Sequence, residues 1–491
     1  MKIYYTKAIL LTSILLSTTS SALTLEEATY IAIENNPSVR QSIAIYHENK
    51  AAVDLAKSGY KPSLDLSAGL GHETTYNTDT DDVSLTRREL SISFTQPLFR
   101  GFQTQNEIKR SINEAEASRW TALTTIENIA LDVADVFSNV LRFKELLKLS
   151  ELNLKAHERI YQQLKLKSEA GVGRQSDLTL INARLSKAHS NRLAAINNLV
   201  DAKSQYLRVV GELPPEDLIL PVPDRDLLPT SLEMALEQAL ENNPAIAVAN
   251  FDAQATEHAK LSAQSAFYPQ IDFDVERTWN NNFDGTKGPA EDLLAVVRLR
   301  YNLYRGGSDK QRLSITEQQI IQAQEVRRDT IRGTELTVRL AWAAHKATAA
   351  QKKYMQQHVI ATKESQMAYE NQFRLGRRTL LDVLDSENEL FQARQDYVNT
   401  DYDELFSEFR LFNSKGQLMR ALRVYSPLVL GFNDTPEDES NIATPRQDAI
   451  ESLKQAESAL LSDEPINTSG SQTSPLTESD LFLDYEDGRG W

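Results

Sequence analysis

The segment LEEATYIAIENNP at residues 25–37 returns as LEMALEQALENNP at residues 232–244, an offset of 207 residues. The same offset aligns Pro62 with Pro269, in the segments YKPSLDL and YPQIDF. Internal similarity at a fixed spacing indicates that the chain contains two copies of one structural unit.

Beyond these segments the offset becomes 205 residues and stays constant. It relates PLFRG to NLYRG, Gly171 to Gly376, Asp177 to Asp382, and Gly211 to Gly416. We therefore divide the chain into a first repeat at 23–212 and a second repeat at 231–425. The proline-rich segment LPPEDLILPVPDRDLLPT, residues 213–230, links the two.

Each repeat should contain the same elements in the same order. A helix of about thirty residues comes first, at 25–58 and 232–266, and ends near a proline, which resists continuation of a helix. Two strands follow, then a very long helix, a glycine turn and a second long helix. The predicted long helices are 101–170 and 175–210 in the first repeat, and 306–375 and 379–420 in the second.

The long helices carry the clearest pattern in the sequence. No proline occurs between Pro97 and Pro214, and a helix that fills such a stretch is roughly 100 Å long. One apolar stripe alternates spacings of three and four residues: Ile126, Ile129, Val133, Val136, Val140, Phe143 and Leu147. Its counterpart is made of Leu336, Leu340, Ala343, Ala347, Ala350 and Tyr354. This periodicity predicts coiled-coil packing of helices along their length.

Apolar and polar residues alternate in the predicted strands, at about 62–72, 88–99, 270–279 and 293–304. Each has about the ten residues that a tilted strand needs to cross a bilayer. An ordinary soluble hairpin could show the same alternation. If the strands do span a membrane, four are too few to close a barrel, so the chain must oligomerise. Three copies would supply twelve strands.

The ends of the chain predict export. Lys2 and Lys7, a short apolar run and the small residues before position 22 form a secretory signal peptide at 1–22. Residues 426–491 are acidic and rich in Ser, Thr and Pro, which predicts a disordered tail, with one short helix from 445 to 461. Most of the net charge of −16 lies in that tail, so nucleic acid is not expected as a partner.

The segments YENQFRLGRRTLLDVLDSENELFQARQ (369–395) and AGVGRQSDL (170–178) resemble the TolC family of outer-membrane channel proteins. The resemblance extends over roughly residues 23–425, and is greatest to the outer-membrane components of type I secretion systems that export adhesins. It implies a mostly α fold with a small transmembrane β part. As a homotrimer, the duplicated helix-strand-strand-helix unit would form a 12-stranded outer-membrane β-barrel and a long periplasmic α-helical barrel.

The resemblance also implies partners and sites. A periplasmic membrane-fusion adaptor protein would dock at the tip turns, which contain Gly171, Gly173 and Gly376, and would connect the duct to an inner-membrane transporter of ABC type. Outer-membrane lipid would surround the barrel of this Gram-negative protein. The residues imply neither a cofactor nor an enzyme.

Asp382 and Asp385 lie three positions apart at the start of a helix. Such acids are often ordinary surface residues favoured by the helix dipole. In a threefold tube they would instead form a ring of six carboxylates, a constriction that selects cations and can be blocked by them. No structural metal is expected.

The family also closes its entrance with links between hairpins. Ser176 and Asp177 match its acceptor positions, and Arg378 matches the basic partner. Phe373 stands where the best-known member has tyrosine, so a hydrogen bond from that side chain to Asp177 is impossible.

Three functions stay open on the sequence. The first is a passive duct of a tripartite export machine for protein (adhesin) cargo by type I secretion. The second is a small-molecule or drug efflux channel. The third, of a different class, is a secreted periplasmic coiled-coil structural or adaptor protein without a barrel.

Overall fold

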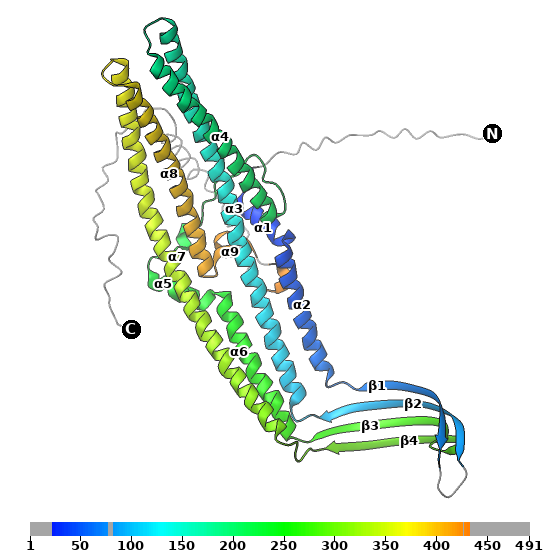
Figure 1. Ribbon diagram of the computed structural model, residues 1–491. Helices are drawn as coiled ribbons and strands as arrows, with labels where there is room; N and C mark the ends of the chain where they lie inside the picture. Colours follow the sequence, from blue (N-terminus) through cyan, green and yellow to red (C-terminus); the bar gives the residue numbers. More distant parts are fainter. Residues whose placement is uncertain (1–21, 77–81, 426, 433–491) are drawn as a thin grey trace, which may run out of the picture.

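The computed structural model describes residues 22–76, 82–425 and 427–432. The predicted signal peptide, apart from its last residue, and the predicted helix at 445–461 lie outside these ranges. Long helices run side by side through most of the molecule, and a small sheet extends from one end (Figure 1). No helix among the described residues is both long and apolar enough to cross a membrane.

The sheet is made by both repeats. It contains β1 (Ser63–Thr75), β2 (Val83–Phe99), β3 (Gln270–Phe283) and β4 (Thr286–Arg300). The strands are antiparallel in the order β1-β2-β3-β4, so each repeat contributes one hairpin, and β2 and β3 join the two. β1 and β4 form the outer edges of the sheet.

The strands are longer than predicted at their hairpin ends, whereas β2 ends at Phe99 and β3 begins at Gln270 as predicted. The paired segments reach Thr75, Val83, Phe283 and Thr286, because polar residues near the hairpin turns still form the ladder after the apolar alternation ends. The predicted end of β4 at 304 is wrong, since the strand stops at Arg300. Gly306 and Gly307 then adopt positive φ angles and turn the chain into the next helix.

Two helical hairpins form the body of the molecule. The first consists of α3 (Gln103–Glu169) and α4 (Gln175–Val210), and the second of α7 (Ser308–Arg374) and α8 (Leu380–Ser414). The 67 residues of α3 correspond to a length of roughly 100 Å. The predicted single helix at 379–420 is wrong at its end. Gly416 has a φ of +69°, which interrupts the helix before the short α9 (Leu418–Ala421).

The first helix of each repeat is two helices, which corrects the single helix predicted at 25–58 and at 232–266. These are α1 (Leu25–Asn35) and α2 (Pro37–Ser58), and α5 (Leu232–Asn242) and α6 (Pro244–Ala263), the last followed by η2 (Gln264–Phe267). Each break lies at the repeated Asn-Asn-Pro, where an asparagine caps the second helix and the proline takes its first position.

The capping asparagines also explain why this motif recurs with a glycine late in each repeat. The Asn36 side chain donates a hydrogen bond to the carbonyl oxygen of Val209 (3.2 Å), and Asn243 does the same to Ser414 (3.0 Å). Each asparagine therefore ties the break in the first helix to the end of the second long helix, just before Gly211 or Gly416.

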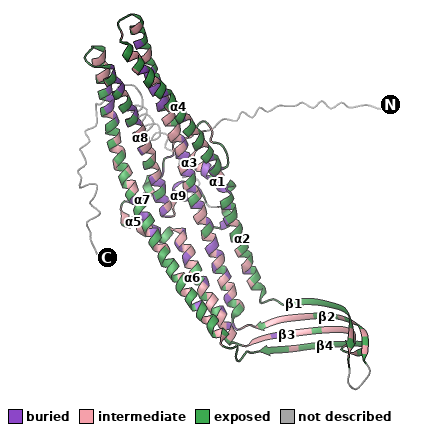
Figure 2. Cartoon of the chain, viewed as in Figure 1, coloured by how far each residue is buried: buried purple, intermediate pink, exposed green. Residues whose placement is uncertain are grey.

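The two apolar stripes predicted on the long helices have different environments. Ile126, Val133 and Val140 on α3 are at most 2% exposed and belong to the largest apolar cluster, together with residues of α1, α2, α4 and α8. On α7, Leu336 is 58% exposed and Leu340 52%. Much of the length of α7 is accordingly drawn as exposed in Figure 2. The α7 stripe thus lacks a neighbour within the described protomer.

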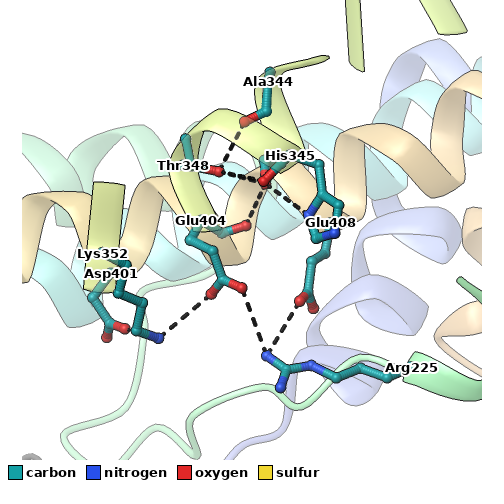
Figure 3. A network of polar contacts seen from close by, with 9 residues as sticks. Arg225, Ala344, His345, Thr348, Lys352, Asp401, Glu404 and Glu408 are labelled. Atoms are coloured by element: carbon teal, nitrogen blue, oxygen red, sulfur yellow. Dashed lines mark hydrogen bonds and ion pairs between the residues drawn. The ribbon is translucent and has the colours of Figure 1, made fainter. Parts of the chain in front are cut away.

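The linker is held against α8 by an arginine that lies beside two largely buried carboxylates. It contains η1 (Arg225–Leu227), and the Arg225 guanidinium lies 3.2 Å from Glu408 and 3.8 Å from Glu404 (Figure 3). Lys352 on α7 forms ion pairs with Asp401 and Glu404. Burial alone would lower the pKa of Lys352, but the two carboxylates raise it above its usual value.

The chain that follows α8 is fastened to α3. The buried Glu127 carboxylate accepts hydrogen bonds from the backbone N–H groups of Leu418 and Met419. Beyond these, η3 (Leu428–Leu430) accepts a bond from Arg119, whose guanidinium also stacks on Phe432. The tail predicted to be disordered from 426 therefore includes a docked segment at 427–432. Its remainder lies outside the described residues.

Candidate functional site

The two glycine turns lie together at the end of the molecule opposite the sheet (Figure 1). Gly171 and Gly376 have φ angles of +75° and +73°, a region that glycine reaches without strain. Around Gly376, the N–H of Arg377 donates to Gln372 and that of Gly376 to Phe373. This Schellman pattern satisfies the last carbonyls of the helix and reverses the chain tightly.

Gly173 serves a different purpose from the other two. Its φ angle is not positive, but a Cβ atom there would lie 2.7 Å from the backbone nitrogen of Ser168. The first turn therefore closes against the end of α3 only because no side chain is present. Val172 and Leu375, at the two turns, are 79% and 71% exposed, so each tip presents an apolar side chain to the surroundings.

Asp382 belongs to the cap of α8. Its carboxylate accepts hydrogen bonds from the backbone N–H and the hydroxyl of Thr379, at 3.0 and 2.8 Å, while its own N–H donates to the Thr379 hydroxyl. The bonds from Thr379, with a smaller contribution from Arg378, hold the pKa of the Asp382 carboxyl below its usual range. Asp382 is therefore a fixed negative charge at neutral pH.

Asp385 has a different partner. The guanidinium of Arg184, on α4 of the other hairpin, lies 3.0 Å from its carboxylate. The two aspartates are therefore not equivalent, because Asp382 is held by the helix cap of its own hairpin and Asp385 is paired with a cation across the hairpins. A ring built from these residues would contain arginines as well as carboxylates.

Sequence reasoning missed Arg184, although a signal was present. The offset of 205 residues aligns Arg184 with Glu389, so the two repeats carry opposite charges at equivalent positions. A reversal of charge between otherwise similar helices indicates that the two positions have different neighbours.

Within the described part of the protomer, Arg378 is not joined to Ser176 or Asp177. Arg378 donates a hydrogen bond to Gln372 (3.0 Å) and stacks on the Tyr369 ring, both on its own hairpin. Ser176 lies 3.4 Å from the carboxylate of the neighbouring Asp177. The structure thus brings Ser176 and Asp177 together, and it places Arg378 elsewhere.

Phe373 makes a contact that the sequence did not suggest. The ammonium group of Lys167, near the end of α3, lies 5.5 Å from the centre of its ring. Beneath this contact lies an apolar cluster from all four long helices, whose buried members are Leu164, Ile181, Leu380 and Leu384. A phenylalanine can therefore hold the two hairpins together here through a cation–π contact and packing, without a hydroxyl group.

Among the described residues, no group of three or more His, Asp or Glu side chains is arranged to hold a metal ion.

Comparison with known proteins gives a consistent result. The model of the family described as outer membrane efflux protein matches residues 28–212 and 235–417, one match for each repeat. The outer membrane efflux protein BepC of Brucella suis is 26% identical over 402 residues, which cover 80% of this chain and 86% of that protein.

One of two further relatives is named for protein secretion. The outer membrane protein TolC of Escherichia coli is 23% identical and covers 85% of this chain and 87% of its own length. The alkaline protease secretion protein AprF of Pseudomonas aeruginosa is 21% identical, with coverages of 81% and 85%. Among solved structures, the outer membrane protein VceC of Vibrio cholerae superposes with a TM-score of 0.69 at 16% identity, over 80% of this chain and 96% of VceC.

Proposed function

The chain belongs to the outer membrane efflux protein family, and from that premise we propose that it is the exit duct of a tripartite export machine. As a family member it is an outer-membrane channel with a periplasmic helical tunnel, and not an enzyme. In the proposed machine, an inner-membrane transporter supplies the energy, and a periplasmic adaptor docks at the hairpin tips. The duct conducts cargo passively.

The observation that carries this proposal is that a single protomer leaves two sheet edges unpaired and one coiled-coil stripe exposed. β1 and β4 are open edges of the sheet, and unpaired strand edges are too costly to leave exposed in lipid. Next to β4 in the chain, α7 exposes a stripe with the spacing of a coiled-coil seam, including Leu336 and Leu340. A homotrimer would pair β1 of one protomer with β4 of the next and would cover the α7 stripe.

The first experiment asks whether the assembled protein conducts. We expect the purified full-length protein to migrate as a heat-modifiable trimer and to give discrete conductance steps in planar lipid bilayers. A protein recovered as a soluble monomer without conductance would instead fit the periplasmic structural or adaptor protein.

Cation block tests the proposed constriction at the tip. Replacing both Asp382 and Asp385 with asparagine is expected to weaken block by divalent or trivalent cations about tenfold or more, because the ring loses its fixed negative charge. Single-channel recording measures the blocking concentration. Asp396→Asn is the matched control, since it removes an acid from the same helix about 20 Å away. Equal block of the wild type and the double variant would place the constriction elsewhere.

Arg184→Gln tests the ion pair at the same site from the opposite side. Removal of the guanidinium 3.0 Å from Asp385 should free that carboxylate and strengthen cation block, by a factor of about five for a contribution near 1 kcal/mol. The double variant Arg184→Gln with Asp385→Asn should return to weak block. If Arg184→Gln alone weakens block, Asp385 does not face the conduction path.

For the cargo, we propose protein export by type I secretion, with an adhesin as the exported protein and an ABC-type transporter as the partner. The support is the similarity of the tip segments to that branch of the family. BepC keeps the efflux alternative open, because it is named as an efflux protein. Deletion of the gene should abolish surface display of a large adhesin and leave drug sensitivity unchanged, whereas the reverse pattern would favour efflux.

A further inference from the structure

Alternate residues along β2 distinguish the two faces of the sheet. Arg88, Leu90 and Ile92 are exposed, whereas the residues between them, including Glu89 and Ser91, are partly covered. The strand ladder extends this exposed face across the sheet. Leu90 pairs with Trp279, and Ile92 pairs with Arg277, so both side chains of β3 lie on the same face.

This face is apolar for most of its height. Its exposed apolar residues include Leu299 (61%), Val297 (60%) and Leu64 (71%) towards the helices, and Leu66 (70%) and Leu293 (66%) in the row of Arg277. In the proposed barrel, this band contacts lipid chains. Arg277 lies within this band, Trp279 occupies the next row together with Leu90, and Leu70 lies one row further. A tryptophan on such a face marks the level of the lipid headgroups.

The Arg277 guanidinium is held in place at this level. It lies 2.6 Å from the carboxylate of Glu291 and 5.3 Å from the centre of the Trp279 ring. Glu291 occupies the same row as Trp279 in the ladder. A guanidinium has five N–H donors, so one carboxylate and a ring face leave donors for a further anion.

Arg88 lies one row beyond Trp279 on the same face, opposite Asn281 and Leu70. Its side chain is exposed, and within the described part of the chain no carboxylate forms an ion pair with it. The rows of Arg277 and Arg88 are four residues apart along the ladder, or roughly 13 Å. Two cations are therefore presented on the lipid-facing surface, one on each side of a tryptophan.

We propose that Arg277 and Arg88 form a binding site for the phosphate groups of lipid A in the outer leaflet. The inference rests on the proposed function, because it requires the hairpin end of the barrel to face outwards, away from the periplasmic helices (Figure 1). Lipid A carries a phosphate at each end of its disaccharide. Guanidinium groups bind phosphate oxygens through paired hydrogen bonds. Two arginines on this face therefore favour a lipid that carries phosphate over lipids in general.

The test compares lipids that differ only in phosphate. Purified, delipidated full-length protein is titrated by native mass spectrometry with lipid A that carries both phosphates, with the same lipid after dephosphorylation, and with phosphatidylglycerol. We expect the wild type to bind the phosphorylated lipid A about tenfold more tightly than either of the others. Equal affinity for the phosphorylated and dephosphorylated forms would overturn the proposal. Equal affinity for phosphatidylglycerol would replace it with a site for anionic lipids in general.

Variants assign the preference to these two side chains. Arg88→Gln with Arg277→Gln should reduce the preference at least fivefold, and the corresponding lysine pair should retain part of it. Arg298→Gln is the matched control, since Arg298 pairs with Asp274 on the opposite face of the sheet. This variant should leave the preference unchanged. If it removes the preference to the same extent, the site is not on this face.

The single variant Arg88→Gln covers the case in which loss of Arg277 prevents assembly, and it should reduce the preference by itself. Conductance of the wild-type protein in planar bilayers separates the two hypotheses. A wild type that conducts but shows no preference for phosphate contradicts this inference alone, whereas a wild type that neither inserts nor conducts contradicts the proposed function.

Discussion

Arg225→Ala is expected to destabilise the folded protein by about 2 to 3 kcal/mol. Arg225 is the cation that the linker places beside Glu404 and Glu408, and the Glu408 side chain is only 2% exposed. Removing one partner of a buried ion pair commonly costs about 3–5 kcal/mol, because the other charge stays buried. We expect less here, since the Arg225 side chain is itself 58% exposed and water screens its charge.

The stability that Arg225→Ala loses should depend on pH in a defined direction. Burial raises the pKa of the Glu408 carboxyl to about 7; the nearby Glu404 adds to this shift and Arg225 opposes it. Between about pH 4.5 and 7 the folded protein therefore binds more protons at Glu408 than the unfolded chain, so stability falls as pH rises through this window. Without Arg225 the pKa of Glu408 rises further. The variant should then be less destabilised at pH 6 than at pH 8.

Chemical denaturation followed by circular dichroism, on the full-length protein in detergent at both pH values, measures the effect. Glu408→Gln mimics the protonated carboxyl and should remove most of the pH dependence. Combined with Arg225→Ala, it should recover part of the lost stability at pH 8. An equal loss at both pH values, without recovery in the double variant, would mean that Arg225 acts through packing alone.

Gly416→Ala is expected to cost about 3 kcal/mol or more. A Cβ atom there would lie 2.6 Å from Cδ of Pro244 and 2.7 Å from the carbonyl oxygen of Asn242, and overpacking of this kind costs about 1–3 kcal/mol. The φ angle of +69° adds about 1–2 kcal/mol for any residue with a Cβ atom. Both atoms belong to the break between α5 and α6, so the contact cannot relax without moving that junction.

Substitutions at two other glycines separate the cost of the steric overlap from the cost of the positive φ angle. Gly376 has a similar φ angle but nothing within 4 Å of an added Cβ atom, so Gly376→Ala should lose only the backbone part. Gly333 lies inside α7 with open space around it, and Gly333→Ala should stabilise the helix by about 0.5–1 kcal/mol. Denaturation midpoints of the three variants give the comparison. If Gly416→Ala is no worse than Gly376→Ala, the contact with Pro244 does not limit the fold.

Local pattern was enough to predict the long helices, because their signals lie within the helices themselves. The absence of proline and the spacing of Ile126, Val133 and Val140 can be recognised without knowing which distant residues they contact. The break at Asn36 was missed for a related reason. Apolar periodicity continues across it, and Pro37, which is the first residue of the next helix, lies inside the range predicted as one helix.

The contacts that define the tip could not be read from local pattern. Arg184 and Asp385 are 201 residues apart in sequence, and which of several charged residues meet across two hairpins depends on how the helices are rotated against each other. The buried cluster around Glu408 was hidden for the same reason, since an acid on a long helix is read as a solvent-exposed residue. The linker sequence gave no sign that Arg225 would reach it.

The duplication has a consequence for how a ring is built. Each protomer contributes two different helical hairpins that already pack side by side. A trimer would therefore contain six hairpins, although only three molecules have to associate. Half of the contacts between neighbouring hairpins would form while a single chain folds, and only the other half would depend on association between molecules. Closure is then less sensitive to protein concentration than it would be for six separate single-hairpin subunits.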